Sequence, residues 1–501
     1  MVSFILFTAI LILGYFVYGK LTEKIFVIKP DAQTPAYRLQ DGVDFMPMPV
    51  WKTLMIQLLN IAGTGPIFGA IAGALFGPAA FAWIVLACIF AGAVHDFMVG
   101  MLSVRNDGAS FAEIVGKYLG KGPLYIMRVF SIVLLVFVGV VFIYTPAQVL
   151  QTIYARSRSI TASDAMTFYY ICIAVIIAYY IVATLVPIDK LIGRIYPVFG
   201  ASLIIMALGI TIMMFVSGDV KNIPEFAFRN FRPDRDTNIM AKIFPFLFIT
   251  IACGAISGFH ATQSPLMARC IKNEGEGRKV FYLAMILEGI IAMIWASVTM
   301  AHFNVVGVET SVSAPVVVTN SSVEYMGWIG GILAIVGVVA CPITSGDTAF
   351  RSARLSIADI FKFSQKPMKN RLLIAIPLFA AGIGILLFAL QSTANFGIVW
   401  RYFAWSNQTL AAIGLWTASA YLAKTGKNYW FTLLPAAFMT SVITAYFLTA
   451  NECLGPIITA ATGNPNITYM IGVIIGICLA VILFVLFIPM IGIKQKGIIK
   501  E

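Results

Sequence analysis

The chain has 501 residues, of which 60% are hydrophobic and 11% are charged, and its formal net charge is +12. Soluble domains carry about 25% charged residues, so this composition excludes an ordinary soluble domain and predicts a polytopic membrane protein. The positive charge does not indicate nucleic-acid binding, because most of it lies in loops on one predicted side of the membrane.

Thirteen segments are long and apolar enough to cross a bilayer, which takes roughly 17–25 apolar residues. The first lacks the basic start and the small-residue cleavage site of a signal peptide, so we expect a retained transmembrane helix. Segment 109–119 is too polar to span and predicts an amphipathic helix at the membrane surface. The predicted spans are 3–19, 52–76, 79–101, 124–146, 165–187, 195–217, 240–267, 280–301, 326–347, 372–391, 400–423, 430–450 and 469–492.

The lysine and arginine residues predict the orientation. When alternate loops are assigned to one side, beginning with the loop after the first span, that side collects 26 of the 34 basic residues and the other side collects 8. Cytoplasmic loops are the ones that are enriched in lysine and arginine. The sequence therefore predicts a cytoplasmic C-terminus and an N-terminus outside.

Glycines interrupt two of the predicted spans. Span 52–76 contains Gly63-Thr64-Gly65-Pro66, and span 240–267 contains Gly254-Ala255-Ile256-Ser257-Gly258. Unwound backbone in a bilayer is tolerated only inside protein or around a polar cavity, because lipid cannot satisfy its hydrogen-bonding groups. Two such breaks in matching positions of two repeats point to the substrate site of a secondary transporter.

The order of the spans supports this interpretation. Without the first span and the last two, ten remain, and the breaks begin 11 and 12 residues after Lys52 and Lys242. Each half contains five spans. Because five is an odd number, the two halves begin on opposite sides of the membrane, so the repeats are inverted. This all-α arrangement, a 5+5 inverted repeat with broken first and sixth core helices, resembles the leucine-transporter fold of the amino acid–polyamine–organocation superfamily. The alternative is ordinary glycine-rich helix packing.

The predicted organisation has four parts. They are an extra N-terminal helix with its loop (1–51), the first repeat (52–217), the second repeat (240–423), and two accessory helices with a tail (430–501).

The two breaks are the predicted substrate site. The N–H groups at the start of a half-helix favour a carboxylate, and exposed carbonyl groups can hold a cation. The predicted substrate-binding residues are Asn60, Gly63, Thr64, Gly65, Ser257, Gly258, His260, Thr262 and Gln263.

Ionisable and polar residues elsewhere in the spans are candidates for ion coupling or gating, since charged groups at membrane depth are costly and are functional by default. A buried carboxylate or imidazole can take up and release protons as access alternates. The structural alternative is a residue that pins helices together, as Asp347 can with Arg351 at i+4. Glu288 is a further candidate of this kind. The predicted coupling or gating residues are His95, Asp96, Thr344, Ser345, Asp347, Asn407 and, near an outer gate, Arg401.

Several strings in the sequence are distinctive. They are Asn60-Ile61-Ala62-Gly63-Thr64-Gly65-Pro66-Ile67, Gly92-Ala93-Val94-His95-Asp96-Phe97, Ser257-Gly258-Phe259-His260-Ala261-Thr262-Gln263, Thr344-Ser345-Gly346-Asp347-Thr348-Ala349-Phe350-Arg351 and Phe403-Ala404-Trp405-Ser406-Asn407-Gln408. With them, essentially the whole chain resembles the carbon starvation protein A family. The resemblance implies a prokaryotic inner-membrane carrier that takes up peptides or pyruvate during nutrient limitation, with proton coupling expected for the pyruvate branch.

The predicted function is alternating-access import of a small carboxylate-bearing nutrient, coupled to protons. The alternative is a sodium-coupled symporter of the amino-acid type, in which Thr344 and Ser345 join carbonyls of the first broken helix. We expect no cofactor, no metal and no nucleic-acid partner; the partners are a small-molecule substrate and the lipid bilayer. A metalloenzyme built on His95, Asp96 and His260 lacks ligand spacing, and a channel lacks a repeated pore loop. The oligomeric state and the choice among peptide, pyruvate and amino acid stay open.

Overall fold

The computed structural model describes residues 1–42, 44–157, 161–185, 189–228, 230–307, 313–364 and 367–498. Within these ranges all regular structure is helical. Ten helices are long and apolar enough to cross a membrane, or eleven when one bent pair counts as a single span. The all-α membrane fold is therefore confirmed. Four basic residues of the orientation count lie outside the described residues, namely Arg158, Arg229, Lys366 and Lys500.

The α-helices follow the order of the predicted spans. They are α1 (Val2–Phe26), α2 (Pro35–Arg38), α3 (Val50–Ile61), α4 (Thr64–Gly73), α5 (Ala79–Ala87), α6 (Ala93–Arg105), α7 (Phe111–Leu119), α8 (Lys121–Ser157), α9 (Ala162–Leu185), α10 (Asp189–Ser217), α11 (Ile243–Thr250), α12 (His260–Ala268), α13 (Leu283–Val306), α14 (Ala314–Leu333), α15 (Cys341–Phe361), α16 (Met368–Leu390), α17 (Thr393–Lys424), α18 (Trp430–Thr449), α19 (Gly455–Thr462) and α20 (Pro465–Ile498).

Short helical turns of other kinds connect several of these helices. The 3-10 turns are η1 (Ala74–Phe76), η3 (Asp219–Asn222), η4 (Ile239–Ala241) and η5 (Glu274–Glu276). The π-helical turns are η2 (Cys88–Gly92), η6 (Arg278–Tyr282) and η7 (Ala334–Ala340).

Each of the thirteen predicted spans has a helical counterpart. Two of them are less apolar or less continuous than a simple span. Span 240–267 divides into the short helices α11 and α12, and span 400–423 lies in α17, where Asn407 and Gln408 lower the mean hydropathy. Both amides are fully buried, so protein rather than lipid surrounds them.

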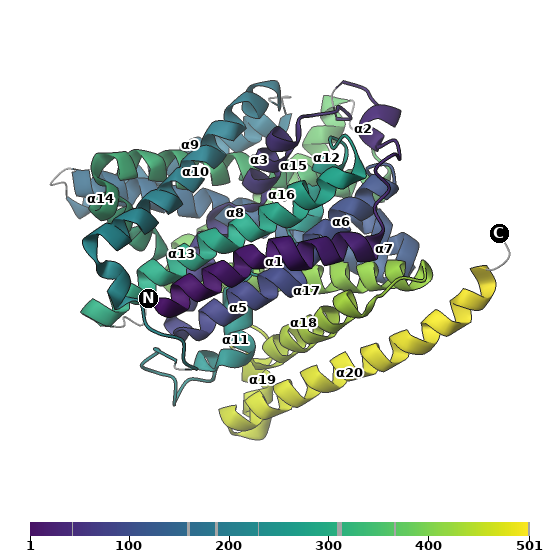
Figure 1. The fold of residues 1–501 in the computed structure, drawn as a ribbon. Helices are drawn as coiled ribbons and strands as arrows, with labels where there is room; N and C mark the ends of the chain where they lie inside the picture. The colour runs from purple at the N-terminus through teal and green to yellow at the C-terminus, as the bar shows by residue number, and fades with distance from the viewer. Residues whose placement is uncertain are drawn as a thin grey trace.

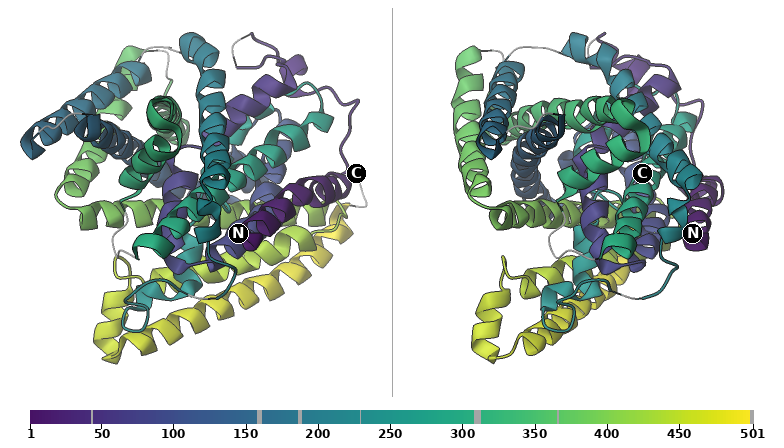
Figure 2. Two further views of the ribbon diagram at one scale, coloured as in Figure 1. Left: turned by 60° about the vertical axis from the view of Figure 1, so that its left-hand side comes forward. Right: turned by 90° about the vertical axis from the view of Figure 1, so that its left-hand side faces the viewer.

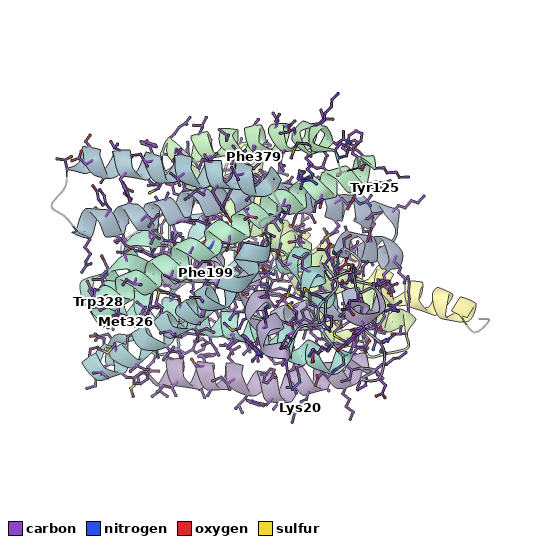
Figure 3. All side chains as sticks on the ribbon, turned by 90° about the horizontal axis from the view of Figure 1, so that it is seen from above. Lys20, Tyr125, Phe199, Met326, Trp328 and Phe379 are labelled. Carbon is purple, nitrogen blue, oxygen red and sulfur yellow. The ribbon has the colours of Figure 1, made fainter. Side chains whose placement is uncertain are left out.

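The eighth core span is shorter than its continuous helical trace suggests. Gly327 has a φ of 61° and a ψ of −143°, which glycine adopts without strain. The chain folds back there so tightly that a Cβ on Gly330 would lie 1.8 Å from the carbonyl oxygen of Ser322. Residues 314–326 therefore form a separate helix, and Met326 and Trp328 lie together at one end of the molecule (Figure 3).

Burial separates core helices from peripheral ones. In the most apolar window, 89% of the α5–α6 span and 83% of the span that contains α13 are buried, against 28% for α1 and 17% for α20. Figures 1 and 2 show α20 packed along α18 at one edge of the bundle, as their contacts require. Lys20 on α1 and Phe379 on α16 lie on opposite sides of the molecule (Figure 3). Of the three helices predicted outside the two repeats, α1 and α20 are the least buried spans, whereas half of the α18 window is buried.

The two broken helices meet at the centre of the bundle. Helices α3 and α4 are bent by 51° at their break. A Cβ on Gly65 would lie 2.5 Å from the sulfur of Cys253, and a Cβ on Gly69 would lie 3.1 Å from the carbonyl oxygen of Thr250. Glycine at these positions lets α4 lie against the unwound chain between α11 and α12.

The second break also packs directly against α17. A Cβ on Gly258 would lie 2.3 Å from the carbonyl oxygen of Asn407 and 2.5 Å from the backbone nitrogen of Ala411. Because these neighbours are backbone atoms of a buried helix, they cannot move aside as a flexible side chain would.

We expect Gly258→Ala to destabilise the protein by about 1–3 kcal/mol through overpacking. Thermal unfolding of the detergent-solubilised protein measures this as a lower midpoint. Gly384→Ala is the matched control, because Gly384 is a helical glycine of α16 whose Cβ would meet nothing within 4 Å. Equal midpoints for the two variants would contradict the close packing of the break on α17.

Candidate functional site

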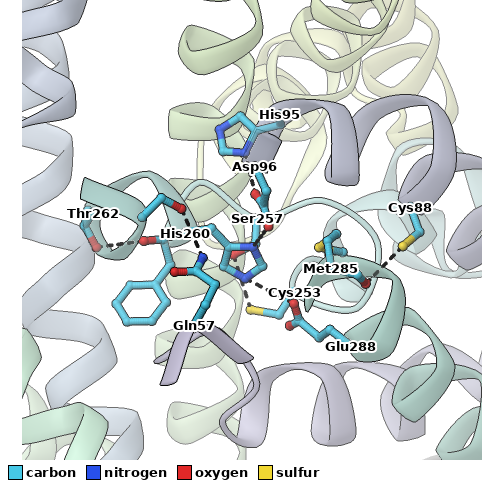
Figure 4. A network of polar contacts seen from close by, with 12 residues as sticks. Gln57, Cys88, His95, Asp96, Cys253, Ser257, His260, Thr262, Met285 and Glu288 are labelled. Carbon is cyan, nitrogen blue, oxygen red and sulfur yellow. Dashed lines mark hydrogen bonds and ion pairs between the residues drawn. The ribbon is translucent and has the colours of Figure 1, made fainter. Parts of the chain in front are cut away.

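The first residue of α12, His260, contacts two buried carboxylates. Its Nδ1 lies 2.6 Å from Oδ2 of Asp96 on α6, and its Nε2 lies 3.3 Å from Oε2 of Glu288 on α13. The Nδ1 atom of His95 lies 2.9 Å from the other oxygen of Asp96 (Figure 4). All four side chains have no exposed surface. We call His95, Asp96, His260 and Glu288 the central ionisable cluster.

The electrostatics of this cluster depend on its protons. Two carboxylates and two imidazoles are buried together, and an unpaired charge is costly to bury. Within the described residues, Oε1 of Glu288 has no hydrogen-bond partner, and Oε2 has only the 3.3 Å contact with His260. A carboxyl group in that position is much less costly to bury with a proton bound. The arrangement can therefore hold and exchange a proton between His260 and its two acidic neighbours.

A π-helical turn precedes three of the core helices that supply polar side chains to this region. The turn η2 leads into α6 and Asp96, η6 leads into α13 and Glu288, and η7 leads into α15 with Thr344 and Ser345. Single π turns inside helices are rare and occur often at functional sites, because they shift the register of the residues that follow.

Asn407 supplies the hydrogen bonds that the unwound backbone needs. Its Oδ1 accepts the backbone N–H of Phe259 at 2.6 Å and the hydroxyl of Ser257 at 3.1 Å. Its backbone oxygen accepts the N–H of Gly258 at 3.1 Å. Its side-chain nitrogen lies 3.2 Å from the sulfur of Cys253. One buried residue of α17 thus holds most of the second break.

The remaining polar residues of the second break bond within α12 or to α3. The Thr262 hydroxyl donates to the carbonyl oxygen of Phe259 at 2.7 Å, and the Gln263 amide donates to that hydroxyl at 2.8 Å. The amide of Gln57 on α3 donates to the hydroxyl of Ser264 at 3.1 Å, which joins the two broken helices.

The carbonyl groups of the first break face α15. The Cys341 thiol lies 3.6 Å from the carbonyl oxygens of both Leu59 and Ala62. The Ser345 hydroxyl lies 3.5 Å from the Leu59 oxygen, and the Thr344 hydroxyl donates to the Cys341 oxygen at 2.8 Å. Of the two predicted hydroxyls, that of Ser345 lies beside the end of α3, and that of Thr344 is bonded within α15.

On its other side, the first break packs against α8. The hydroxyl groups of Thr64 and Thr145 are 3.5 Å apart, and a Cβ on Gly63 would lie 2.8 Å from the ring of Phe142. Asn60, on the last turn of α3, is 7% exposed.

Two predicted gating residues have partners away from the central ionisable cluster. Asp347 accepts the hydroxyl of Tyr179 at 2.7 Å and lies 3.6 Å from Arg351, which is the i+4 pair that the sequence indicates. Arg401 forms an ion pair with Glu452 at 2.8 Å, in the link between α18 and α19. Their placement joins neighbouring helices.

A second polar group joins α6 to the chain after α12. The Arg105 guanidinium donates from Nε and Nη2 to the two oxygens of Glu274, at 2.9 and 2.7 Å, and from Nη1 to the hydroxyl of Tyr421 at 2.5 Å. We call Arg105, Glu274 and Tyr421 the latch. Nearby, burial and then the charge of Arg105 lower the pKa of Lys427 to about 8.

Sequence reasoning missed the latch and underrated Glu288. Arg105 and Glu274 are 169 residues apart, and no motif connects them. Glu288 did carry a signal, because it is an acidic residue inside an otherwise apolar span. Among the described residues, no group of three or more His, Cys, Asp or Glu side chains has the geometry to hold a metal ion.

Comparison with known proteins identifies the family. The family described as carbon starvation protein CstA matches residues 1–188, 159–326 and 311–446. These matches cover most of the chain, so the protein belongs to this family.

Its relatives include membrane proteins and transporters. An uncharacterized membrane protein of Haemophilus influenzae is 47% identical over 63% of this chain and 95% of its own length. The peptide transporter CstA of Bacillus subtilis is 26% identical over 89% of this chain and 90% of its own. The pyruvate/proton symporter BtsT of Escherichia coli is 26% identical over 54% of this chain and 45% of its own. The chain is thus a multi-pass bacterial membrane protein with transporter relatives.

The solved structures show the same fold. MhsT in complex with L-phenylalanine superposes with a TM-score of 0.53 at 15% identity, covering 87% of this chain and 98% of MhsT. At this identity the likeness establishes the fold alone, which is the leucine-transporter type with its two broken helices.

We expect Asn407→Leu to leave the Phe259 N–H buried without an acceptor and to cost about 1–3 kcal/mol. The measurement is the thermal unfolding midpoint in detergent. Asn395→Leu is the matched control, since Asn395 lies on the same helix and its side-chain hydrogen bonds are exposed. A midpoint for Asn407→Leu as high as that of the control would show that the break does not depend on this side chain.

Proposed function

We propose that this protein imports a small carboxylate-bearing nutrient, a short peptide or pyruvate, by alternating access and that a proton gradient drives the import. The observation that carries the proposal is the contact of His260, at the start of the second broken helix, with the buried carboxylates of Asp96 and Glu288. The names of the relatives from Bacillus subtilis and Escherichia coli agree with both substrate classes.

The proposed substrate site is formed by two half-helices. Helices α4 and α12 both start at a break, where the first backbone N–H groups of a helix have no intrahelical acceptor. Such N-termini favour negative charge. Thr64 and Ser257 add hydroxyls at these positions, and both are fully buried. A substrate carboxylate between the two half-helices would meet N–H donors from both repeats.

The proposed coupling of transport to protons depends on the central ionisable cluster. When His260 is charged and its acidic neighbours are ionised, attraction holds the start of α12 against α6 and α13. A proton taken up by Asp96 or Glu288 removes one of these attractions and weakens the hold on α12. Coupling between two sites typically amounts to about 1–3 kcal/mol, which is less than the cost of breaking one buried ion pair.

The alternative coupling ion is sodium, bound between the end of α3 and the hydroxyls of α15. A thiol stands in this place, because Cys341 lies 3.6 Å from both the Leu59 and the Ala62 carbonyl oxygens. Sodium is a hard cation and takes oxygen ligands rather than sulfur. We therefore favour protons, with the Ser345 hydroxyl supporting the first break and the Thr344 hydroxyl bonded within α15.

We expect proteoliposomes with the parent protein to accumulate a dipeptide or pyruvate when a proton gradient is applied. Asp96→Asn, His260→Gln and Glu288→Gln should each reduce gradient-driven accumulation at least tenfold while exchange of labelled for unlabelled substrate persists. His302→Gln is the matched control, since the third histidine of the chain is exposed on α13. Uptake that follows a sodium jump and is lost in Ser345→Ala would favour sodium. Absence of any gradient-dependent uptake would overturn the proposed function.

Alternating access also requires a closed end, and we assign that role to the latch. Arg105 joins α6 to Glu274 after α12 and to Tyr421 at the end of α17. Its Nη2 also donates to the carbonyl oxygen of Val27, after α1, at 2.8 Å. By the predicted orientation this group lies at the cytoplasmic end.

We expect Glu274→Gln to open this end more often, because a neutral amide cannot pair with the guanidinium as a carboxylate does. In a variant whose only cysteine is Cys253, at the meeting point of the two breaks, an impermeant maleimide added from the cytoplasmic side should react at least fivefold faster. Glu23→Gln is the control, because Glu23 pairs with Arg278 at 2.6 Å and this pair joins α1 to η6 rather than α6 to the chain after α12. Equal labelling rates in the two variants would exclude the latch as a gate.

A further inference from the structure

An apolar groove runs along the outside of the bundle between α8, α15 and α16. It has a volume of about 620 Å³, and every residue that lines it is apolar. Its wall on α16 extends from Leu373 to Ile385, a stretch of thirteen residues that is about 18 Å long. That length is close to the depth of one leaflet of a bilayer whose hydrocarbon core is about 30 Å thick.

The groove faces outward and not toward the central ionisable cluster. Among its lining residues, Phe361 is 64% exposed, Leu373 is 61% exposed and Val133 is 39% exposed. Phe379 and Tyr125, on two of the three helices that form it, lie on the side of the molecule opposite Lys20 (Figure 3). In a membrane this surface is in contact with lipid.

Basic residues gather at one end of the groove. Lys362 follows Phe361 at the end of α15, and Lys369 and Arg371 precede Leu373 at the start of α16. A short link joins α15 to α16, so these residues share one end of the bundle.

Helix α8 contributes a further basic residue at the same end. Arg128 lies one turn before the groove residue Ile132, and its charge reaches Asp359 near the end of α15. Asp359 also interacts there with Glu113, and Arg371 interacts with the further cation Arg354. Basic side chains therefore outnumber acidic ones at this end of the groove.

We propose that this groove binds an anionic phospholipid, with one acyl chain along α16 and the phosphate among Arg128, Lys362, Lys369 and Arg371. The apolar lining fits a hydrocarbon chain. A substrate with a carboxylate would find no polar partner in it. The excess of positive charge selects against a zwitterionic headgroup, whose own cation would be repelled. Clusters of basic residues between membrane helices are typical sites for anionic headgroups.

The test compares retained lipid in variants that change either half of the site. The protein is reconstituted in nanodiscs made from equal parts of phosphatidylglycerol and phosphatidylcholine, transferred to mild detergent, and its co-purified lipid is quantified by mass spectrometry. We expect the parent to retain phosphatidylglycerol at least threefold over phosphatidylcholine. Lys369→Gln with Arg371→Gln should abolish the selectivity, and Ala381→Trp should abolish retention because it fills the groove.

Two controls match these changes. Lys20→Gln with Lys24→Gln removes two exposed charges from α1, on the opposite side of the molecule. Ala380→Trp adds the same bulk one residue away from the groove residue Ala381, at an alanine that is also exposed. Both controls should retain lipid as the parent does. Equal retention of the two lipids by the parent, or unchanged retention in Ala381→Trp, would overturn the proposal.

Discussion

The structure depends on satisfying unwound backbone at the centre of a membrane protein. Lipid offers no donors or acceptors, so protein must supply them. At the second break Asn407 does so from α17, and at the first break Cys341 and Ser345 stand against the carbonyl groups from α15. This requirement fixes α15 and α17 beside the breaks and explains why polar residues persist in these two helices.

The same constraint positions the ionisable residues. His260 is the first helical residue after the second break and follows Phe259 directly. The hydrogen bond from Phe259 to Asn407 therefore also fixes the position of the His260 imidazole. Gly92, at the end of η2, allows α6 to approach the break, since a Cβ there would lie 2.3 Å from the carbonyl oxygen of Ala255. Asp96 follows one turn later and meets the imidazole. The central ionisable cluster is therefore a consequence of how the break is packed.

Local patterns in the sequence predict the helices and both breaks well, because hydropathy and glycine spacing are local properties. They predict contacts poorly. The sequence assigns His260 to substrate and Asp96 to coupling, yet these side chains, 164 residues apart, touch. Asn407 was predicted to take part in ion coupling or gating. In the structure its side chain accepts a backbone N–H of the second break. The turn at Gly327 also escaped prediction, since the predicted span 326–347 includes this glycine.

The central ionisable cluster and the latch connect the same two segments of the chain. Helix α6 carries Asp96 at its start and Arg105 at its end, and the segment from α12 to η5 carries His260 at its start and Glu274 at its end. A nine-residue helix, α12, lies between the two contacts. If a proton taken up at the cluster weakens its hold on α12, the latch becomes the main polar contact between these segments. The proposed proton site and the proposed gate would then act on one short helix, which gives coupling a direct mechanical route.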